Sequence, residues 1–206
     1  SSPYGEVWQS GLTGGNASGG SSPINNPKSL SYSSAQSGKL WAGTAGGDAF
    51  LCDAPPITNC PAPVLVDSVN SLPVEGIATT DDDTTKAFAL TTDGIFSVAY
   101  AGSVGASTRL ATGDFTGITD QSGIYYARGL SATNKCAFYA SPNGLEYITR
   151  DKSATGVLAS FGGRRVLSVY APIFAGQKDQ HVYFTLFEQT ASLGGVYRVK
   201  IPAACL

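Results

Sequence analysis

Four short apolar segments recur along the chain at nearly constant spacing. Each begins with a basic residue and continues with aromatic or small apolar side chains, and together they cover residues 39–45, 86–92, 135–141 and 181–187. Their first residues are 47, 49 and 46 positions apart. A constant period of this length is typical of repeat architectures, in which each repeat is one supersecondary unit. The pattern therefore predicts four copies of the same unit.

A turn that contains glycine follows each apolar segment, and a second apolar stretch follows the turn. The turns are Gly46-Gly47, Asp93-Gly94, Asn143-Gly144 and Gly194-Gly195. These dipeptides supply the positive φ angles that tight hairpin turns require. Each unit is therefore predicted to contain a β-hairpin.

Further strands are predicted on both sides of the hairpins. One precedes each hairpin, at residues 28–32, 75–79, 122–126 and 165–169, and one follows each of the first three, at 64–66, 108–111 and 157–160. The fourth hairpin has no such successor, but residues 5–10 form a suitable strand ahead of the first unit. An N-terminal strand that completes the last unit would close a ring and remove an exposed sheet edge.

The predicted fold class is all-β, a four-bladed β-propeller of four-stranded antiparallel blades in one domain over residues 1–206. The units span approximately residues 28–69, 75–113, 122–161 and 165–202, the last completed by residues 5–10. A β-sandwich and a β-solenoid are the alternatives. A solenoid normally has shorter periods, and a sandwich does not predict four equivalent hairpins.

The second unit resembles the blades of the NHL and YWTD-like propeller superfamily. The segments that carry the resemblance are residues 73–81, 87–90, 93–98 and 108–111, and the other units are similar more loosely. The resemblance implies a secreted protein of propeller architecture and implies no activity.

Composition agrees with a β-rich chain and excludes some partners. Charged residues make up 14% of the sequence, against about 25% in an average soluble domain, and there are 25 glycines and 11 prolines. The formal net charge is −2, and Arg164-Arg165 is the largest basic cluster. We therefore expect no nucleic-acid partner. No apolar run approaches the roughly 20 residues that span a bilayer, so we expect no membrane insertion.

The four cysteines predict two disulfides. The proline-containing loop between Cys52 and Cys60 is suited to closure by one bridge, and the propeller topology places Cys136 and Cys205 at the same end of adjacent blades. Disulfides indicate an oxidising compartment, so we expect a secreted or cell-surface protein, extracellular or periplasmic. A chain that starts at Ser1 and has no methionine agrees with a processed mature chain, and the alternative is an excerpt of a longer protein. Free thiols are the alternative for the cysteines.

Candidate ligand-binding residues gather in the loops that the topology brings to one end of the blades. They are Asp93, Asp114, Asp120, Asn143, Arg164, Arg165 and Glu188. Loops of this kind commonly carry the binding sites of repeat proteins. The alternative for Asp93 and Asn143, which precede glycine, is a local role in the turn. Arg164 and Arg165 have the chemistry to clamp a carboxylate, and the alternative is a solvated pair.

No catalytic pattern stands out, and the sequence favours a non-catalytic protein over an enzyme. The single histidine, His181, begins an apolar strand, and no G-x-S-x-G nucleophile elbow is present. The run from Asp81 to Asp83 lacks the calcium-loop pattern of an EF-hand. No glycine-rich phosphate loop occurs. We expect no cofactor and no metal site, although glycoside hydrolysis needs only two well-placed carboxylates.

The leading functional hypothesis is a non-catalytic extracellular binding or adhesion module, lectin-like, for a glycan or an extracellular or cell-surface protein. A lectin would place aromatic residues such as Trp8, Trp41 or Tyr126 beside the polar loops, and the alternative is that these residues form core. Two further hypotheses are a structural subunit of a surface layer or fibre and a propeller-type hydrolase. The sequence is compatible with an oligomer.

Overall fold

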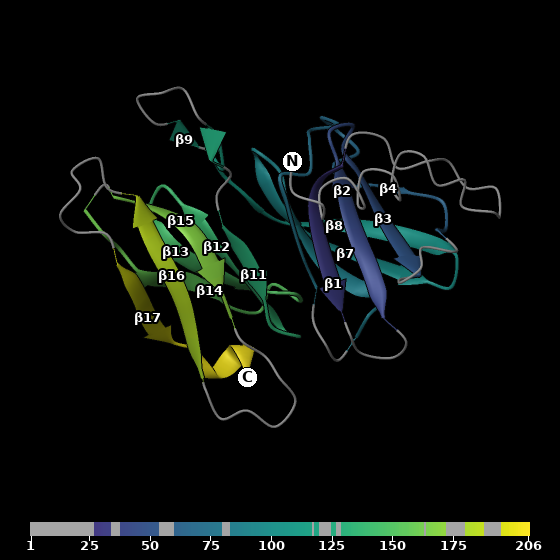
Figure 1. Ribbon diagram of the computed structural model, residues 1–206. Helices are drawn as coiled ribbons and strands as arrows, with labels where there is room; N and C mark the ends of the chain where they lie inside the picture. The colour runs from purple at the N-terminus through teal and green to yellow at the C-terminus, as the bar shows by residue number, and fades with distance from the viewer. Residues whose placement is uncertain are drawn as a thin grey trace, which may run out of the picture.

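A computed structural model describes most of the chain as short antiparallel sheets (Figure 1). The described residues are 27–33, 38–53, 60–79, 83–116, 118–119, 125–126, 129–162, 164–171, 180–187 and 195–206. Within them the helical element is a short 3-10 turn, Ala203–Cys205. None of the described residues forms a helix of sufficient length and hydrophobicity to cross a bilayer.

Four sheets follow one another along the chain, and in each the strands are paired in sequence order. The first contains β1 (Pro27–Ser33), β2 (Lys39–Thr44), β3 (Asp48–Asp53) and β4 (Val64–Leu65). The second contains β5 (Gly76–Thr79), β6 (Lys86–Leu90), β7 (Gly94–Ala101) and β8 (Val104–Thr112). The third contains β11 (Leu130–Ala132), β12 (Cys136–Ser141), β13 (Gly144–Thr149) and β14 (Thr155–Ala159), and the fourth contains β15 (Arg165–Tyr170), β16 (His181–Phe187) and β17 (Val196–Lys200).

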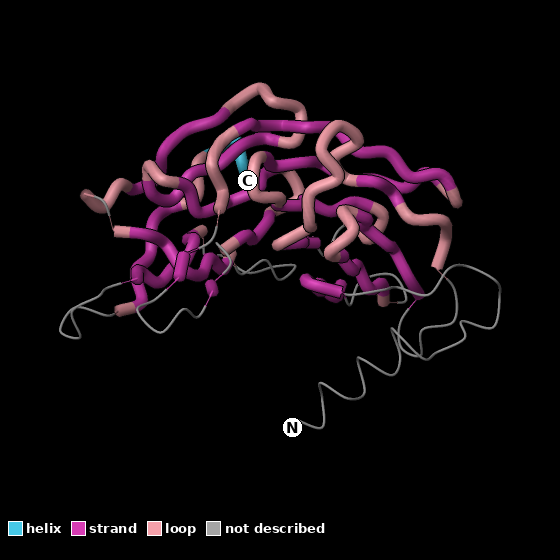
Figure 2. Tube along the Cα trace, turned by 90° about the horizontal axis from the view of Figure 1, so that it is seen from above, coloured by secondary structure: helices cyan, strands magenta, loops and turns pink. Residues whose placement is uncertain are grey.

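The first strands of successive sheets lie side by side. Strand β1 contacts β5, β5 contacts β11, and β11 contacts β15. The sheets follow an arch in Figure 2. Three buried clusters lie between successive sheets, so each sheet packs one face against the next. The fold is a four-bladed β-propeller. This confirms the predicted fold class, and we name the sheets blades 1 to 4 in chain order. The strand predicted at residues 5–10 lies outside the described residues, so its pairing with β17 remains a prediction.

One predicted strand is wrong. The sequence pattern predicts the first strand of blade 3 at residues 122–126, but this strand is β11, which begins at Leu130. Tyr125–Tyr126 forms β10 and pairs with β9 (Ile118–Thr119) in a separate two-stranded sheet. The physical reason is packing, since Ala132 of β11 is buried in the core between blades 2 and 3. Gly129 also allows the chain to approach blade 4, because a Cβ there would collide with the backbone of Val169.

One buried aromatic side chain from each of the first three blades packs into the following blade. Trp41 of β2, Phe88 of β6 and Phe138 of β12 are fully buried. They belong to the cores between blades 1 and 2, 2 and 3, and 3 and 4 respectively. Each lies in the second strand of its blade, within the repeated apolar segment. The repeat of the apolar segments in the sequence therefore corresponds to the repeat of packing contacts between blades.

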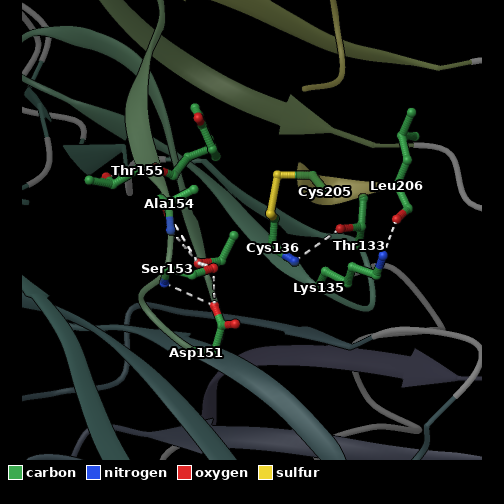
Figure 3. Close-up of a disulfide and its surroundings, with 11 residues drawn as sticks. Thr133, Lys135, Cys136, Asp151, Ser153, Ala154, Thr155, Cys205 and Leu206 are labelled. Atoms are coloured by element: carbon green, nitrogen blue, oxygen red, sulfur yellow. Dashed lines mark hydrogen bonds between the residues drawn. A yellow bond between two sulfur atoms is a disulfide. The ribbon is translucent and has the colours of Figure 1, made fainter. Parts of the chain in front are cut away.

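Both predicted disulfides are present. Cys52–Cys60 closes a sequence separation of 8, and Cys136–Cys205 closes one of 69. The second joins the C-terminal 3-10 turn to β12, and the Lys135 ammonium donates to the Leu206 carbonyl beside it (Figure 3). The Cys136 N–H donates to Thr133 Oγ1 at 3.0 Å. The end of blade 4 is thus attached covalently to blade 3.

Removal of the long-range disulfide is expected to destabilise the fold more than removal of the short one. In the loop-entropy model a 69-residue separation corresponds to about 4 kcal/mol and an 8-residue separation to about 2.5 kcal/mol. Urea unfolding of the double variants Cys136→Ser/Cys205→Ser and Cys52→Ser/Cys60→Ser measures both free energies. A larger loss in the second variant would contradict this ranking.

Candidate functional site on the loop face

In blades 1 to 3, the turn between the second and third strands lies beside the connection that leads to the next blade. In blade 1 the Val74 N–H donates to the Thr44 carbonyl at 3.0 Å, and the Val66 N–H donates to the Gly47 carbonyl at 2.9 Å. In blade 2 the Phe115 N–H donates to the Thr92 carbonyl at 2.7 Å. We call the end of the molecule formed by these turns and connections the loop face. Its segments are joined by backbone hydrogen bonds, as a preformed surface requires.

Glycine is required at the turns because the outgoing chain passes directly over them. Gly47 has a φ of 90°, and a Cβ there would lie 3.0 Å from the Leu72 carbonyl oxygen. Gly144 has a φ of 129°, and a Cβ there would collide with the Ala159 carbonyl oxygen. Both the backbone angle and the lack of space exclude a side chain. The glycine of the hairpin motif therefore serves the loop face as well as the turn.

An ion-pair network joins the loops of blades 1 and 2. Arg109 of β8 donates from Nη2 to Asp67 Oδ2 at 2.7 Å, and from Nη1 to the Asp93 carbonyl at 3.2 Å. The guanidinium lies over the Phe96 ring at 4.7 Å from its centroid. Asn70 Nδ2 donates to Asp93 Oδ2 at 2.9 Å. The carboxylate of Asp93 is thus engaged within the protein and contributes to the rigidity of this surface.

Asp67 is charged although it is only 2% exposed. Burial raises the pKa of its carboxyl group, but hydrogen bonds from the Val69 N–H and the Arg109 guanidinium outweigh burial and hold the pKa below its usual range. A lowered pKa means that the folded state favours the carboxylate over the acid. The network therefore stabilises the fold above the carboxyl pKa of the unfolded chain.

The other described candidates lie in successive loops. Asp114 Oδ1 accepts from the N–H and the hydroxyl of Thr116 at 3.0 and 2.6 Å, which is a local Asx turn. The Asn143 N–H donates to Ser141 Oγ at 3.0 Å, and Asn143 Nδ2 donates to Glu146 Oε1 at 2.8 Å. Arg164 and Arg165 are exposed, before and at the start of β15. Their placement on one end of the blades agrees with the topology.

Several predicted residues have a different outcome. Asp120, Glu188 and Trp8 lie outside the described residues, as do Asp81 and Asp82. Trp41 forms core, as the alternative for these aromatic residues holds, and does not lie beside the polar loops: its ring is fully buried, and its Nε1 donates to the Thr84 carbonyl at 3.0 Å. Within the described ranges no three His, Cys, Asp or Glu side chains gather as metal ligands would.

Asp67 and Arg109 are site residues that the sequence pattern does not predict. They are 42 positions apart and belong to different blades. The signal in the sequence is faint. Arg109 is the one charged residue of strand β8, and Asp67 lies two residues before Val69. In the structure the Val69 N–H donates a hydrogen bond to the Asp67 carboxylate. Their proximity follows from the packing of blade 1 on blade 2.

The sequence matches no model of a known protein family and no curated protein sequence. Among solved structures, the chain is similar to the β-propeller domain of Myceliophteria thermophila Cps50 (Swd1), with 16% identity and a TM-score of 0.49 over 85% of this chain and 58% of that one. It is similar to a luciferin-regenerating enzyme, with 15% identity and a TM-score of 0.49 over 85% of this chain and 63% of that one. The extracellular domain of a putative one-component system from B. thetaiotaomicron has 13% identity and a TM-score of 0.35 over 79% of this chain and 26% of that one.

The likeness to these structures is limited to the fold. The chain spans 58% and 63% of the lengths of the first two structures, so it corresponds to part of each. These likenesses do not establish membership of the NHL or YWTD-like superfamily. No activity or ligand is carried over from them.

Asp67→Asn is expected to lower the free energy of unfolding at pH 7 by about 1–3 kcal/mol, because a buried charge-assisted hydrogen bond to Arg109 is lost. The folded pKa of Asp67 lies below the unfolded value of about 3.9. The difference between wild type and variant should therefore be full above about pH 5 and shrink as the pH falls below about 4. Urea unfolding at neutral, mildly acidic and strongly acidic pH measures it.

Asp53→Asn is the matched control. Asp53 forms an ion pair with Lys39 but is 40% exposed, so its loss should cost no more than about 1 kcal/mol. Equal losses in the two variants, or a loss in Asp67→Asn that does not change with pH, would contradict the role of Asp67 in the network.

Proposed function

We propose that this protein is a non-catalytic extracellular binding module that contacts a glycan or a cell-surface protein through the loop face. The observation that supports this most directly is the network around Arg109, which holds the polar loops of two blades in fixed positions. A surface whose polar groups are already ordered loses less conformational entropy when a ligand binds. Carboxylate, amide and guanidinium groups on such a surface suit the hydrogen bonding of sugars and polar peptides.

The disulfides support an extracellular location. All four cysteines are paired, and Cys136 and Cys205 are buried. Stable structural disulfides form and persist in oxidising compartments. A secreted or cell-surface protein that is lectin-like or adhesive satisfies this requirement.

A structural subunit of a surface layer or fibre is a second candidate. Strand β17 has no partner on its outer side among the described residues, and its Val196 side chain is 74% exposed. An open strand edge is a template for pairing with another chain. For the third hypothesis, a propeller-type hydrolase, no described pair of carboxylates is singled out, and Asp93 is engaged by Arg109.

The loop-face proposal is tested on a glycan array and by binding to surface proteins, with variants at two loops. Arg164→Ala removes a charge, and Asp114→Asn removes a charge while keeping a side chain that forms the same turn. Each variant is expected to raise the Kd for the ligand about tenfold. This corresponds to about 1.4 kcal/mol, because each substitution removes one charge-assisted contact with the ligand.

Lys152→Asn is the control, because Lys152 is exposed at the opposite end of blade 3 and its φ of 62° is tolerated by asparagine. Binding that is equally weakened in all three variants, or unchanged in both loop variants, would refute the loop face. Absence of any ligand together with concentration-dependent assembly on size-exclusion chromatography would favour the structural role.

A further inference from the structure

The face of blade 4 that points away from blade 3 carries a row of aromatic and basic side chains. Tyr170 of β15 pairs with Tyr183 of β16, and Tyr183 pairs with Arg198 of β17. Ser168 and Thr185 lie in the adjacent row, and Lys200 lies on the other side of Arg198 along β17. The alternate residues Val182, Phe184 and Leu186 point the other way and are buried against blade 3. We call this the outer face of blade 4.

The outer face of blade 4 departs from the repeat of the other blades. The corresponding central residues are Trp41, Phe88 and Phe138, and each is buried against the next blade. Their partners on the first strand are small, namely Ser31, Ala78 and Ser131, and their partners on the third strand are Leu51, Ser97 and Tyr147. In blade 4 the equivalent partners of Tyr183 are Tyr170 and Arg198.

The equivalent face is mainly apolar and buried in blades 1 to 3, whereas in blade 4 it carries polar and charged side chains that are suited to contact with water. Tyr170 is 55% exposed, and Arg198 and Lys200 are exposed. In a closed ring of four blades this face would meet blade 1, but burial of Arg198 and Lys200 there would need carboxylate partners. The side of blade 1 that points away from blade 2 presents Leu30 and Tyr32, which are also exposed. Among the described residues, the outer face of blade 4 is therefore open to solvent at Tyr170, Arg198 and Lys200.

The described part of the outer face of blade 4 is basic. It carries Arg198 and Lys200, and the described residues of blade 4 contain no Asp or Glu, whereas the whole chain has a formal net charge of −2. A local basic surface on an acidic protein attracts anionic ligands and orients them on approach. The ligand of this face should therefore carry negative charge.

The remaining groups indicate what else the ligand presents. Tyrosine rings offer flat apolar surfaces with a polar tip, on which a sugar ring can stack. The hydroxyls of Ser168 and Thr185 are hydrogen-bonded to each other at 2.7 Å and lie at the surface. The guanidinium of Arg198 has the geometry to donate to both oxygens of a carboxylate. Apolar ring faces, hydroxyl groups and a carboxylate occur together in uronic acid sugars.

We propose that the outer face of blade 4 binds an acidic polysaccharide, with its sugar rings on Tyr170 and its carboxylates on Arg198 and Lys200. The face lies on a different side of the molecule from the loop face, and neither proposal depends on the other. A polysaccharide is favoured over a nucleic acid because the disulfides indicate an extracellular protein. Figure 1 shows β15, β16 and β17 at one end of the series of described blades.

The test uses the full chain with polygalacturonate as the probe and its methyl-esterified form as the uncharged counterpart. Isothermal titration at constant salt should detect binding of polygalacturonate and at least about tenfold weaker binding of the ester. Arg198→Ala/Lys200→Ala should weaken binding of polygalacturonate by about tenfold or more, and Tyr170→Ala by about threefold to tenfold. Tyr170→Phe keeps the ring and should keep the affinity.

Two control variants carry substitutions away from this face. Lys152→Asn removes a distant surface charge, and Asp114→Asn alters the loop face; both should leave binding of polygalacturonate unchanged. An effect of Asp114→Asn together with none of Arg198→Ala/Lys200→Ala would overturn this proposal and leave the loop-face proposal standing. The melting temperature of each variant should equal that of wild type, because the substituted side chains are exposed.

Three other outcomes would overturn the proposal. One is wild-type protein that does not bind polygalacturonate. Another is equal affinity for polygalacturonate, polyglutamate and oligo-dT, which would show unspecific attraction of polyanions or a nucleic-acid ligand. The third is a large drop in melting temperature of Arg198→Ala/Lys200→Ala, which would show that the face is packed against protein.

Discussion

The packing of one central aromatic side chain into the following blade is the interaction on which the rest of the structure depends. A lone four-stranded sheet has two faces and no core, so each blade becomes stable only when another blade covers it. Trp41, Phe88 and Phe138 bury their rings in the three cores between successive blades. Full burial of a side chain of this size contributes about 1.5–3 kcal/mol. Repetition of this contact sets the order of the blades.

The same contact positions the loop face. Once blade 2 is held against blade 1, Arg109 reaches Asp67 and Asp93 and joins the connections of both blades. Gly47 and Gly144 allow the outgoing chain to lie directly on the turns. The polar surface is therefore ordered by core packing below it and by hydrogen bonds within it.

Blade 4 differs from the other blades on the face that points away from blade 3. Blades 1 to 3 each present an apolar face to their successor, but blade 4 presents Tyr170, Tyr183 and Arg198. Aromatic and basic side chains at these positions are suited to contact with water or with a polar ligand. The disulfide Cys136–Cys205 strengthens the attachment of this blade to blade 3.

The amino-acid sequence by itself determined the four hairpins, the all-β fold class and the pairing of the cysteines. These features depend on glycine after a short apolar segment and on a constant period of such segments. The tertiary structure decided the rest. Tyr125 and Tyr126 have the composition of an inner strand, but Leu130–Ala132 takes that place because Ala132 fits the core. Trp41 was a candidate for ligand contact and lies in the core, and Asp67 meets Arg109 across 42 residues. Such contacts depend on which faces of two sheets pack together, and the local spacing of apolar residues does not determine that.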